Sequence, residues 1–127
     1  MKSKIVIILS AAILLTFLLC ACTYRSGAFL KLKESNGDDQ WNASWSSFNG
    51  SIWRNISLEE GIHEFSVDIT TESGDLGLSV KDQNRKDYYT AEKLESSSFT
   101  VQIEGRDKVT IRFEGNKHAG GFKVSWD

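Results

Sequence analysis

The sequence predicts an all-β domain, an antiparallel β-sandwich of jelly-roll-like form, that follows an N-terminal signal helix. Three observations lead to this prediction: apolar and polar residues alternate along most of the chain, turn-forming residues separate the alternating stretches, and no stretch after the signal has convincing helical periodicity. Successive side chains of a strand point to opposite faces of a sheet. Each alternating stretch therefore predicts a strand with one buried face and one wet face.

The alternation is clearest after residue 40. Its apolar members are Trp41, Ala43 and Trp45; Phe65, Val67 and Ile69; Leu76, Leu78 and Val80; Phe99, Val101 and Ile103; Val109, Ile111 and Phe113; and Phe122, Val124 and Trp126. Turn signals separate these stretches, among them Asn49-Gly50, Glu60-Gly61, Glu72-Ser73-Gly74, Asp82-Gln83-Asn84 and Glu104-Gly105. About eight short strands at roughly ten-residue spacing indicate a sandwich or a barrel.

Residues 1–22 have the charge and hydropathy of an export signal. Lys2 and Lys4 give a positive start, residues 5–19 are apolar, and the segment ends in Leu19-Cys20-Ala21-Cys22. This ending resembles the lipobox of bacterial lipoproteins, and the resemblance implies that Cys22 becomes the lipidated first residue of the mature chain. A retained membrane anchor, which needs about 20 apolar residues, and ordinary secretion are the alternatives. All three place the rest of the chain outside the cytoplasm.

These features divide the chain into three parts. A lipoprotein signal peptide spans residues 1–21, the lipidated cysteine and a tether span 22–38, and the β-sandwich spans 39–127. Ala28 to Lys33 fit either a first short strand or a membrane-proximal spacer, and the polar residues on both sides favour the spacer. The length suits a single domain with one core.

Composition argues against several classes of function. The formal net charge is −2 and the basic residues are scattered, so we expect no nucleic-acid partner. Cys20 and Cys22 are the two cysteines of the chain, so the expected mature domain has no free thiol for a disulfide, a metal or catalysis. His63 and His118 fit surface or structural roles better than catalytic ones. Without a Gly-x-Ser-x-Gly elbow or a phosphate-binding loop, we expect no catalytic residues.

One polar stretch offers a candidate metal site. Asp82, Asn84 and Asp87 present oxygen ligands at a spacing similar to part of a calcium loop. The match fails at Lys86, and both the sharp-turn glycine and the distal glutamate are missing. A plain polar turn is the favoured interpretation, with a low-affinity calcium site as the alternative, and no other cofactor is expected.

Aromatic residues provide the candidate ligand-binding site, because exposed rings can stack on sugars. Trp53 is out of phase with the apolar residues around it. The neighbours Tyr88 and Tyr89 must point opposite ways if they lie on a strand, so we expect one of the two to be exposed. Trp41 and Trp45 share one strand face and are further candidates. For these two, filling the core is the favoured role, because large aromatic side chains dominate core burial.

Short motifs suggest a family. They are Ser47-Phe48-Asn49-Gly50, Leu58-Glu59-Glu60-Gly61 and Gly120-Gly121-Phe122-Lys123-Val124-Ser125-Trp126. Together with the lipobox they resemble small bacterial lipoproteins that carry one β-sandwich of unassigned function. The order of strands and turns is also similar to pre-peptidase C-terminal-type domains, which are jelly-roll-like accessory modules of secreted bacterial enzymes. The resemblance covers about residues 48–126 and implies a fold without catalytic residues.

The expected protein is a membrane-anchored, extracytoplasmic lipoprotein of a bacterium, held by lipid on Cys22. We expect a non-catalytic binding module for a cell-envelope ligand, either a glycan or a protein. A structural accessory subunit of an envelope complex, with no small-molecule ligand, is the alternative. An enzyme is a third hypothesis, with no motif in its favour.

Overall fold

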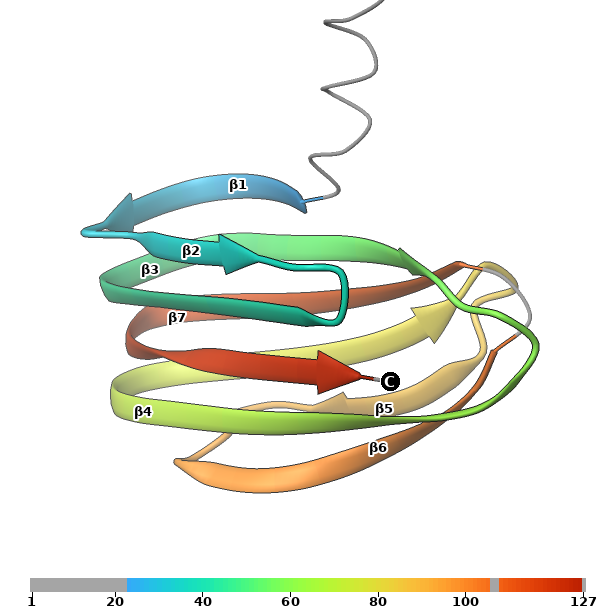
Figure 1. Cartoon of the computed structure of the whole chain (residues 1–127). Coiled ribbons are helices and arrows are strands. Elements are labelled where there is room, and N and C mark those ends of the chain that lie inside the picture. Colours follow the sequence, from blue (N-terminus) through green and yellow to red (C-terminus); the bar gives the residue numbers. More distant parts are fainter. Residues whose placement is uncertain (1–22, 106–107, 127) are drawn as a thin grey trace, which may run out of the picture.

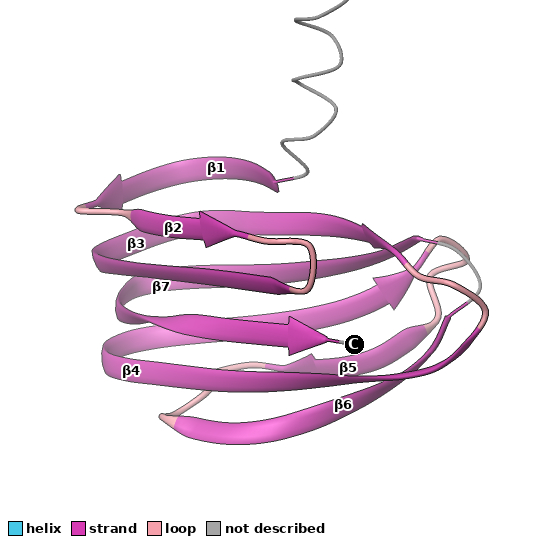
Figure 2. Ribbon diagram, viewed as in Figure 1, coloured by secondary structure: helices cyan, strands magenta, loops and turns pink. Residues whose placement is uncertain are grey.

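The computed structural model describes residues 23–105 and 108–126, and the regular elements of this part are all β-strands (Figures 1 and 2). In chain order they are β1 (Thr23–Leu30), β2 (Lys33–Asn36), β3 (Gln40–Ser57), β4 (Gly61–Asp82), β5 (Asp87–Ala91), β6 (Ser97–Gly105) and β7 (Lys108–Trp126). Their pairings are antiparallel. The predicted all-β antiparallel sandwich is confirmed. The expected signal helix and Cys22 lie outside the described residues, among which no helix is long and apolar enough to cross a membrane.

Three long strands build both layers of the sandwich. β3, β4 and β7 have 18, 22 and 19 residues, and each turns from one layer into the other at the rounded end seen in Figure 1. The register shifts at these bends, between Trp45 and Gly50 in β3 and between Thr71 and Asp75 in β4. The strands are therefore longer than the short ones expected, because the sequence pattern marks each half of a bent strand separately.

The two layers can be named after their edge strands. The β2–β6 sheet runs β2, the first part of β3, the last part of β7, the first part of β4, and β6. The β1–β5 sheet runs β1, the last part of β3, the first part of β7, the last part of β4, and β5. Strands β1 and β2 thus lie at one edge of the sandwich, and β5 and β6 lie at the opposite edge.

The core lies between the two sheets and is made of the inward residues that the alternation predicts. Phe113 of one sheet stacks on Phe122 of the other, with ring centroids 3.9 Å apart, and Trp41 packs edge-on against Phe122 at 4.6 Å. Burying each such large side chain contributes on the order of 1.5–3 kcal/mol relative to leaving it exposed. The interior aromatic cluster therefore joins the two layers.

The expected tether is wrong for residues 23–36, which form β1 and β2. β1 pairs with β3 from Thr23 opposite Arg54 to Leu30 opposite Ser47, and β2 pairs with β3 from Lys33 to Asn36. Phe29 holds β1 in place, because its ring stacks on Phe48 at 4.4 Å. The polar residues that suggested a spacer are those of an edge strand, which commonly carries charge on its open side.

Glycine permits the sharp bends of the long strands. Gly74 has a φ of +76° in the bend of β4, and Gly120 has a φ of +139° in β7. Residues with a β-carbon rarely adopt these angles. A β-carbon on Gly120 would also run into the carbonyl of Thr70. These two glycines let neighbouring strands turn together between the layers.

A buried histidine links the bent strands. His118 is fully buried, and its Nδ1 accepts a hydrogen bond of 2.9 Å from Nε1 of Trp45. Because Nδ1 accepts, the neutral ring carries its proton on Nε2, which donates to Oγ1 of Thr71 at 2.9 Å. Thr71 in turn donates to the carbonyl of Leu94 at 2.8 Å. The chain of bonds ties β3, β7 and β4 to the β5–β6 connection, so His118 has a structural role, as expected.

The environment of His118 favours its neutral form. Burial lowers the pKa of the imidazole below its ordinary value of 6.5, and the nearby carboxylates of Asp75 and Glu72 oppose this shift. Protonation would also place a second donor where Nδ1 now accepts from Trp45. The bend is therefore most stable when His118 is uncharged.

Candidate functional site

Two of the predicted platform residues lie in the core. Trp41 is fully buried, and its Nε1 donates to Oε2 of Glu34 at 2.9 Å. Trp45 is 5% exposed, packs against Phe48 and donates to His118. Neither ring offers an open face to a sugar. Trp41 is therefore not an exposed platform, and both tryptophans have the favoured role in the core.

Trp53 faces outward from the β1–β5 sheet, as its phase predicts, yet its ring is covered on both sides. Tyr24 of β1 stacks on it at 5.7 Å, and the guanidinium of Arg112 from β7 lies over it at 4.8 Å. Tyr24 and Arg112 are its direct cross-strand partners on opposite sides of β3. Arg112 is fixed in turn by hydrogen bonds of 3.1 Å to Ser51 and Glu114. Trp53 is therefore the middle of a cross-strand ladder rather than a free platform.

Tyr88 and Tyr89 join the edge strands β5 and β6, and both are half-buried, so the expectation that one of them is exposed is wrong. The ring of Tyr89 stacks on Phe99 at 5.0 Å. The hydroxyl of Tyr88 donates to the carbonyl of Glu104 at 3.0 Å, and the ammonium of Lys86 lies over its ring at 5.1 Å. The stacking of Tyr89 on Phe99 and the hydrogen bond from Tyr88 to Glu104 each join β5 of one sheet to β6 of the other. The observed role of these two tyrosines is to close the edge of the sandwich.

The calcium candidates form a polar turn. Oδ1 of Asp82 accepts hydrogen bonds of 2.9 Å from the backbone amides of Asn84 and Lys86. Asp87 forms an ion pair with Lys81 at 3.6 Å. Within residues 23–105 and 108–126, no group of three or more histidine, cysteine, aspartate or glutamate residues is placed to hold a metal ion. The Asp82 carboxylate is thus engaged by the turn's own backbone.

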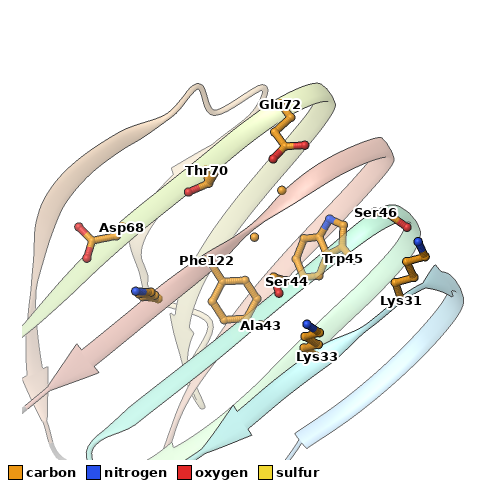
Figure 3. A pocket seen from close by; sticks show the side chains of 13 residues that line it. Lys31, Lys33, Ala43, Ser44, Trp45, Ser46, Asp68, Thr70, Glu72 and Phe122 are labelled. Carbon is orange, nitrogen blue, oxygen red and sulfur yellow. The ribbon is translucent and has the colours of Figure 1, made fainter.

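The structure creates a polar hollow that the sequence did not single out. It has a volume of about 680 Å³ and opens on the outer face of the β2–β6 sheet (Figure 3). Gly121 of β7 lines it together with its register partners, Ser44 on β3 and Thr70 on β4. Because Gly121 has no side chain, the sheet surface is lowered between these two hydroxyls. A β-carbon there would run into the carbonyl of Ala43, so the close approach of β3 and β7 requires glycine.

Opposite charges stand on the two walls of the hollow. Lys31 and Lys33 border it on the β2 side, and Asp68 and Glu72 border it on β4, as Figure 3 shows. Lys123 pairs in register with Asp68 and completes the β4 side. The β2 side therefore offers ammonium donors, and the β4 side offers carboxylate acceptors together with the ammonium of Lys123.

The middle of the hollow is neutral and polar. Ser44, Ser46 and Thr70 bring hydroxyls to the lining, which also includes Trp45, Gly121 and Phe122. A hydroxyl both donates and accepts hydrogen bonds, so this lining can match a ligand rich in hydroxyl or amide groups. Among the described residues that line the hollow there is neither histidine nor cysteine, and Lys33 lies opposite Ser44 in the register of β2 and β3.

The residues of the hollow were visible in the sequence as the polar partners of the alternating stretches. Ser44 lies between Ala43 and Trp45, and Thr70 follows Ile69 in the same alternation. Their phase puts them on the outer face, but phase does not say which strands become neighbours. The register that joins Ser44, Gly121 and Thr70 across three strands appears only in the folded chain.

Comparisons with known proteins give structural neighbours without sequence relatives. No protein-family model matches the chain, and no curated protein matches it in sequence. A carbohydrate-binding module solved with β-1,4-galactotriose, TmCBM61, is 13% identical with a TM-score of 0.49, covering 83% of this chain and 87% of its own. A CBM36 domain of a xylanase from the hindgut metagenome of Trinervitermes trinervoides is 14% identical with a TM-score of 0.43, covering 84% and 92%. The secreted serine protease VesC from Vibrio cholerae is 12% identical with a TM-score of 0.46, over 81% of this chain and 23% of its own.

Proposed function

We propose that this protein is a lipid-anchored, extracytoplasmic module that binds a cell-envelope glycan in the polar hollow of its β2–β6 sheet, without catalysis. One observation carries the ligand assignment. Around Gly121 the hydroxyls of Ser44 and Thr70 stand between two lysines on the β2 side and, on the β4 side, two carboxylates with one further lysine. This set suits a ligand with many hydroxyls and amides and a few charged groups.

The size of the hollow supports a small ligand segment. Its volume of about 680 Å³ falls within the range of roughly 300–1,000 Å³ typical of ligand sites. Its open shape on a sheet face suits part of a longer chain better than an enclosed small molecule. We therefore favour an internal segment of an envelope polysaccharide over a free metabolite.

The anchor is the part of the proposal that comes from the lipobox. Cys22 directly precedes Thr23, the first residue of β1. A diacylglycerol on Cys22 brings two acyl chains, which give stable membrane attachment where one chain does not. Growth with radiolabelled palmitate tests this: wild-type protein should carry label, and the Cys22→Ala variant should not. Absence of label on the wild-type chain would contradict the anchor.

Filling the hollow tests the ligand assignment. Ser44→Tyr should lower the affinity for purified peptidoglycan fragments by about tenfold or more, because a ring at this position occupies the space beside Gly121. The matched control is Ser57→Tyr, which places the same exposed change on β3 but in the other sheet. Isothermal titration should give the control a wild-type affinity. Equal affinity of both variants for the glycan would overturn the site, and retention of a single envelope protein instead of glycan would favour the accessory-subunit alternative.

A further inference from the structure

We infer that the β1–β2 edge of the sandwich lies against an anionic lipid surface, with the β5–β6 edge directed away from it. The inference rests on the proposed anchor at Cys22 and adds an orientation to it. It follows from three properties of this edge: its distance along the chain from Cys22, its exposed apolar side chains and its charge.

The chain leaves almost no slack between the proposed lipid and the sheet. Thr23 is already the first residue of β1 and pairs with Arg54. Consecutive α-carbons are about 3.8 Å apart, so a lipid on Cys22 would hold the start of β1 within the headgroup region. With the expected tether replaced by strands, the domain has no spacer with which to move away from the membrane.

β1 exposes apolar side chains near both of its ends. Tyr24 is 51% exposed and Leu30 is 63% exposed, and both belong to the small set of large apolar side chains that the described residues leave in solvent. Tyrosine is enriched at membrane interfaces, where its ring sits in the apolar boundary and its hydroxyl stays wet. An extended strand rises about 3.3 Å per residue, so the two side chains stand roughly 20 Å apart. Two contacts this far apart would lay the strand along the surface.

The charges of the two edges are opposite in sign. The β1–β2 segment, residues 23–36, carries the exposed cations Arg25, Lys31 and Lys33, and its one acid, Glu34, bonds to the buried Trp41. The far edge, residues 87–105, carries Asp87, Glu92, Glu95 and Glu104 against Lys93, and Asp87 of this set is paired with Lys81 of β4. An anionic leaflet attracts the first edge and repels the second. Charge and exposed apolar groups therefore favour the same orientation.

The orientation places the ligand site close to the lipid. Lys31 and Lys33 belong to the β1–β2 edge and also border the hollow. With this edge on the membrane, the β2–β6 sheet stands upright and its hollow opens sideways, just above the headgroups. A glycan bound there would run parallel to the membrane.

Site-directed spin labels on the full lipidated chain test the orientation. Ser26→Cys places a label on β1, and Ser98→Cys places a matched label on an exposed serine of β6. Cys22 is blocked by lipid and Cys20 is removed with the signal under the proposed function, so each variant has one reactive thiol. In vesicles of phosphatidylglycerol and phosphatidylcholine, power saturation should show the label at 26 shielded from an aqueous nickel reagent by threefold or more relative to the label at 98.

Charge reversal supplies the second readout. Arg25→Glu with Lys31→Glu should return the label at 26 to aqueous accessibility, whereas Lys93→Glu with Lys108→Glu should leave it shielded. Equal accessibility of the two labels on a chain that carries palmitate would overturn the orientation and leave the anchor standing. Absence of palmitate from the wild-type chain would overturn both.

Discussion

The outer faces of the two sheets differ in what stands at their centres, although the same strands build both. On the β1–β5 sheet, β3 and β7 contribute Trp53 and Arg112, which pack side by side with Tyr24 in a ladder. On the β2–β6 sheet the same two strands contribute Ser44 and Gly121, and the surface is hollowed there. The large side chains satisfy one another and close their face. The small ones leave room for a ligand.

The comparison shows why aromatic content was a poor guide to the site. A tryptophan on a sheet face gains most by packing against its cross-strand neighbours, which use up the ring faces that a sugar would need. The Trp53 ring has both faces covered, and Trp41 and Trp45 are buried. A hollow on a sheet arises instead where a row of side chains is interrupted.

The largest expected effect on stability comes from adding a side chain at Gly121, where the row of side chains on the β2–β6 sheet is interrupted. Gly121→Val should destabilise the fold by about 2–4 kcal/mol, because the new side chain meets the carbonyl of Ala43 and the backbone of Ser44. Gly77→Ala is the control on the other outer face, where the nearest atom to an added β-carbon is the carbonyl of Ala91 at 3.3 Å. Urea unfolding should give this control a loss below about 1 kcal/mol. Similar losses for the two would contradict the close approach of β3 and β7.

The bend that joins the two sheets should respond to pH through His118. Its pKa is lowered in the folded state, so the unfolded chain binds the proton more tightly in this range. Unfolding free energy should hold above pH 6.5 and fall as the pH drops from 6.5 toward the lowered folded value, by up to about 1.4 kcal/mol per pH unit. Denaturant unfolding of wild type and His118→Gln across this range measures the effect. A variant with the same pH slope as wild type would show that another group is responsible.

The ladder should matter for stability and leave ligand binding unchanged. Trp53→Ala removes the stacking with Tyr24 and the contact with Arg112, and should cost about 1–2 kcal/mol of unfolding free energy. A double-mutant cycle with Arg112→Ala should show coupling of about 0.5–1 kcal/mol between the two side chains. Loss of glycan affinity in folded Trp53→Ala protein would return the site to the aromatic face.

The smallest effect on stability is expected from reversing the charge of one lysine on each outer face. Lys123→Glu and Lys108→Glu change exposed lysines of β7 on opposite outer faces, and each should alter the unfolding free energy by less than about 1 kcal/mol, the larger change being that of Lys123→Glu, which places a second acid opposite Asp68. Lys123→Glu should nevertheless weaken glycan binding, since Lys123 lines the hollow. Binding curves for the pair check this, and equal affinities would remove Lys123 from the site.

The sequence allowed the fold class and most of the core to be predicted, because the alternation of apolar residues survives in every long strand. Trp126, Phe122 and Val124 lie inward as their phase requires. The sequence favoured a spacer over strands for residues 23–36. The contact that supports a strand there, the stacking of Phe29 on Phe48, exists only in the folded chain. Local polarity cannot report a partner that lies so far along the chain.

The candidate site was missed for a related reason. Trp53 was correctly predicted to face outward, but its two covering partners come from β1 and β7. Gly121 belongs to a glycine pair that is typical of a turn. In the structure it lies within β7, opposite Ser44 of β3 on one side and Thr70 of β4 on the other. The register between strands determines both the covering of Trp53 and the position of Gly121. The alternation within a single strand does not predict that register.

Amide chemical shifts of the isotope-labelled protein, titrated with purified peptidoglycan fragments, test the central claim most directly. The account predicts that the amides of Ser44, Thr70 and Gly121 shift in a saturable manner, while those of Trp53 and Arg112 stay in place. Shifts centred on Tyr24 and Trp53, with the hollow unchanged, would contradict it and make the ladder the binding face.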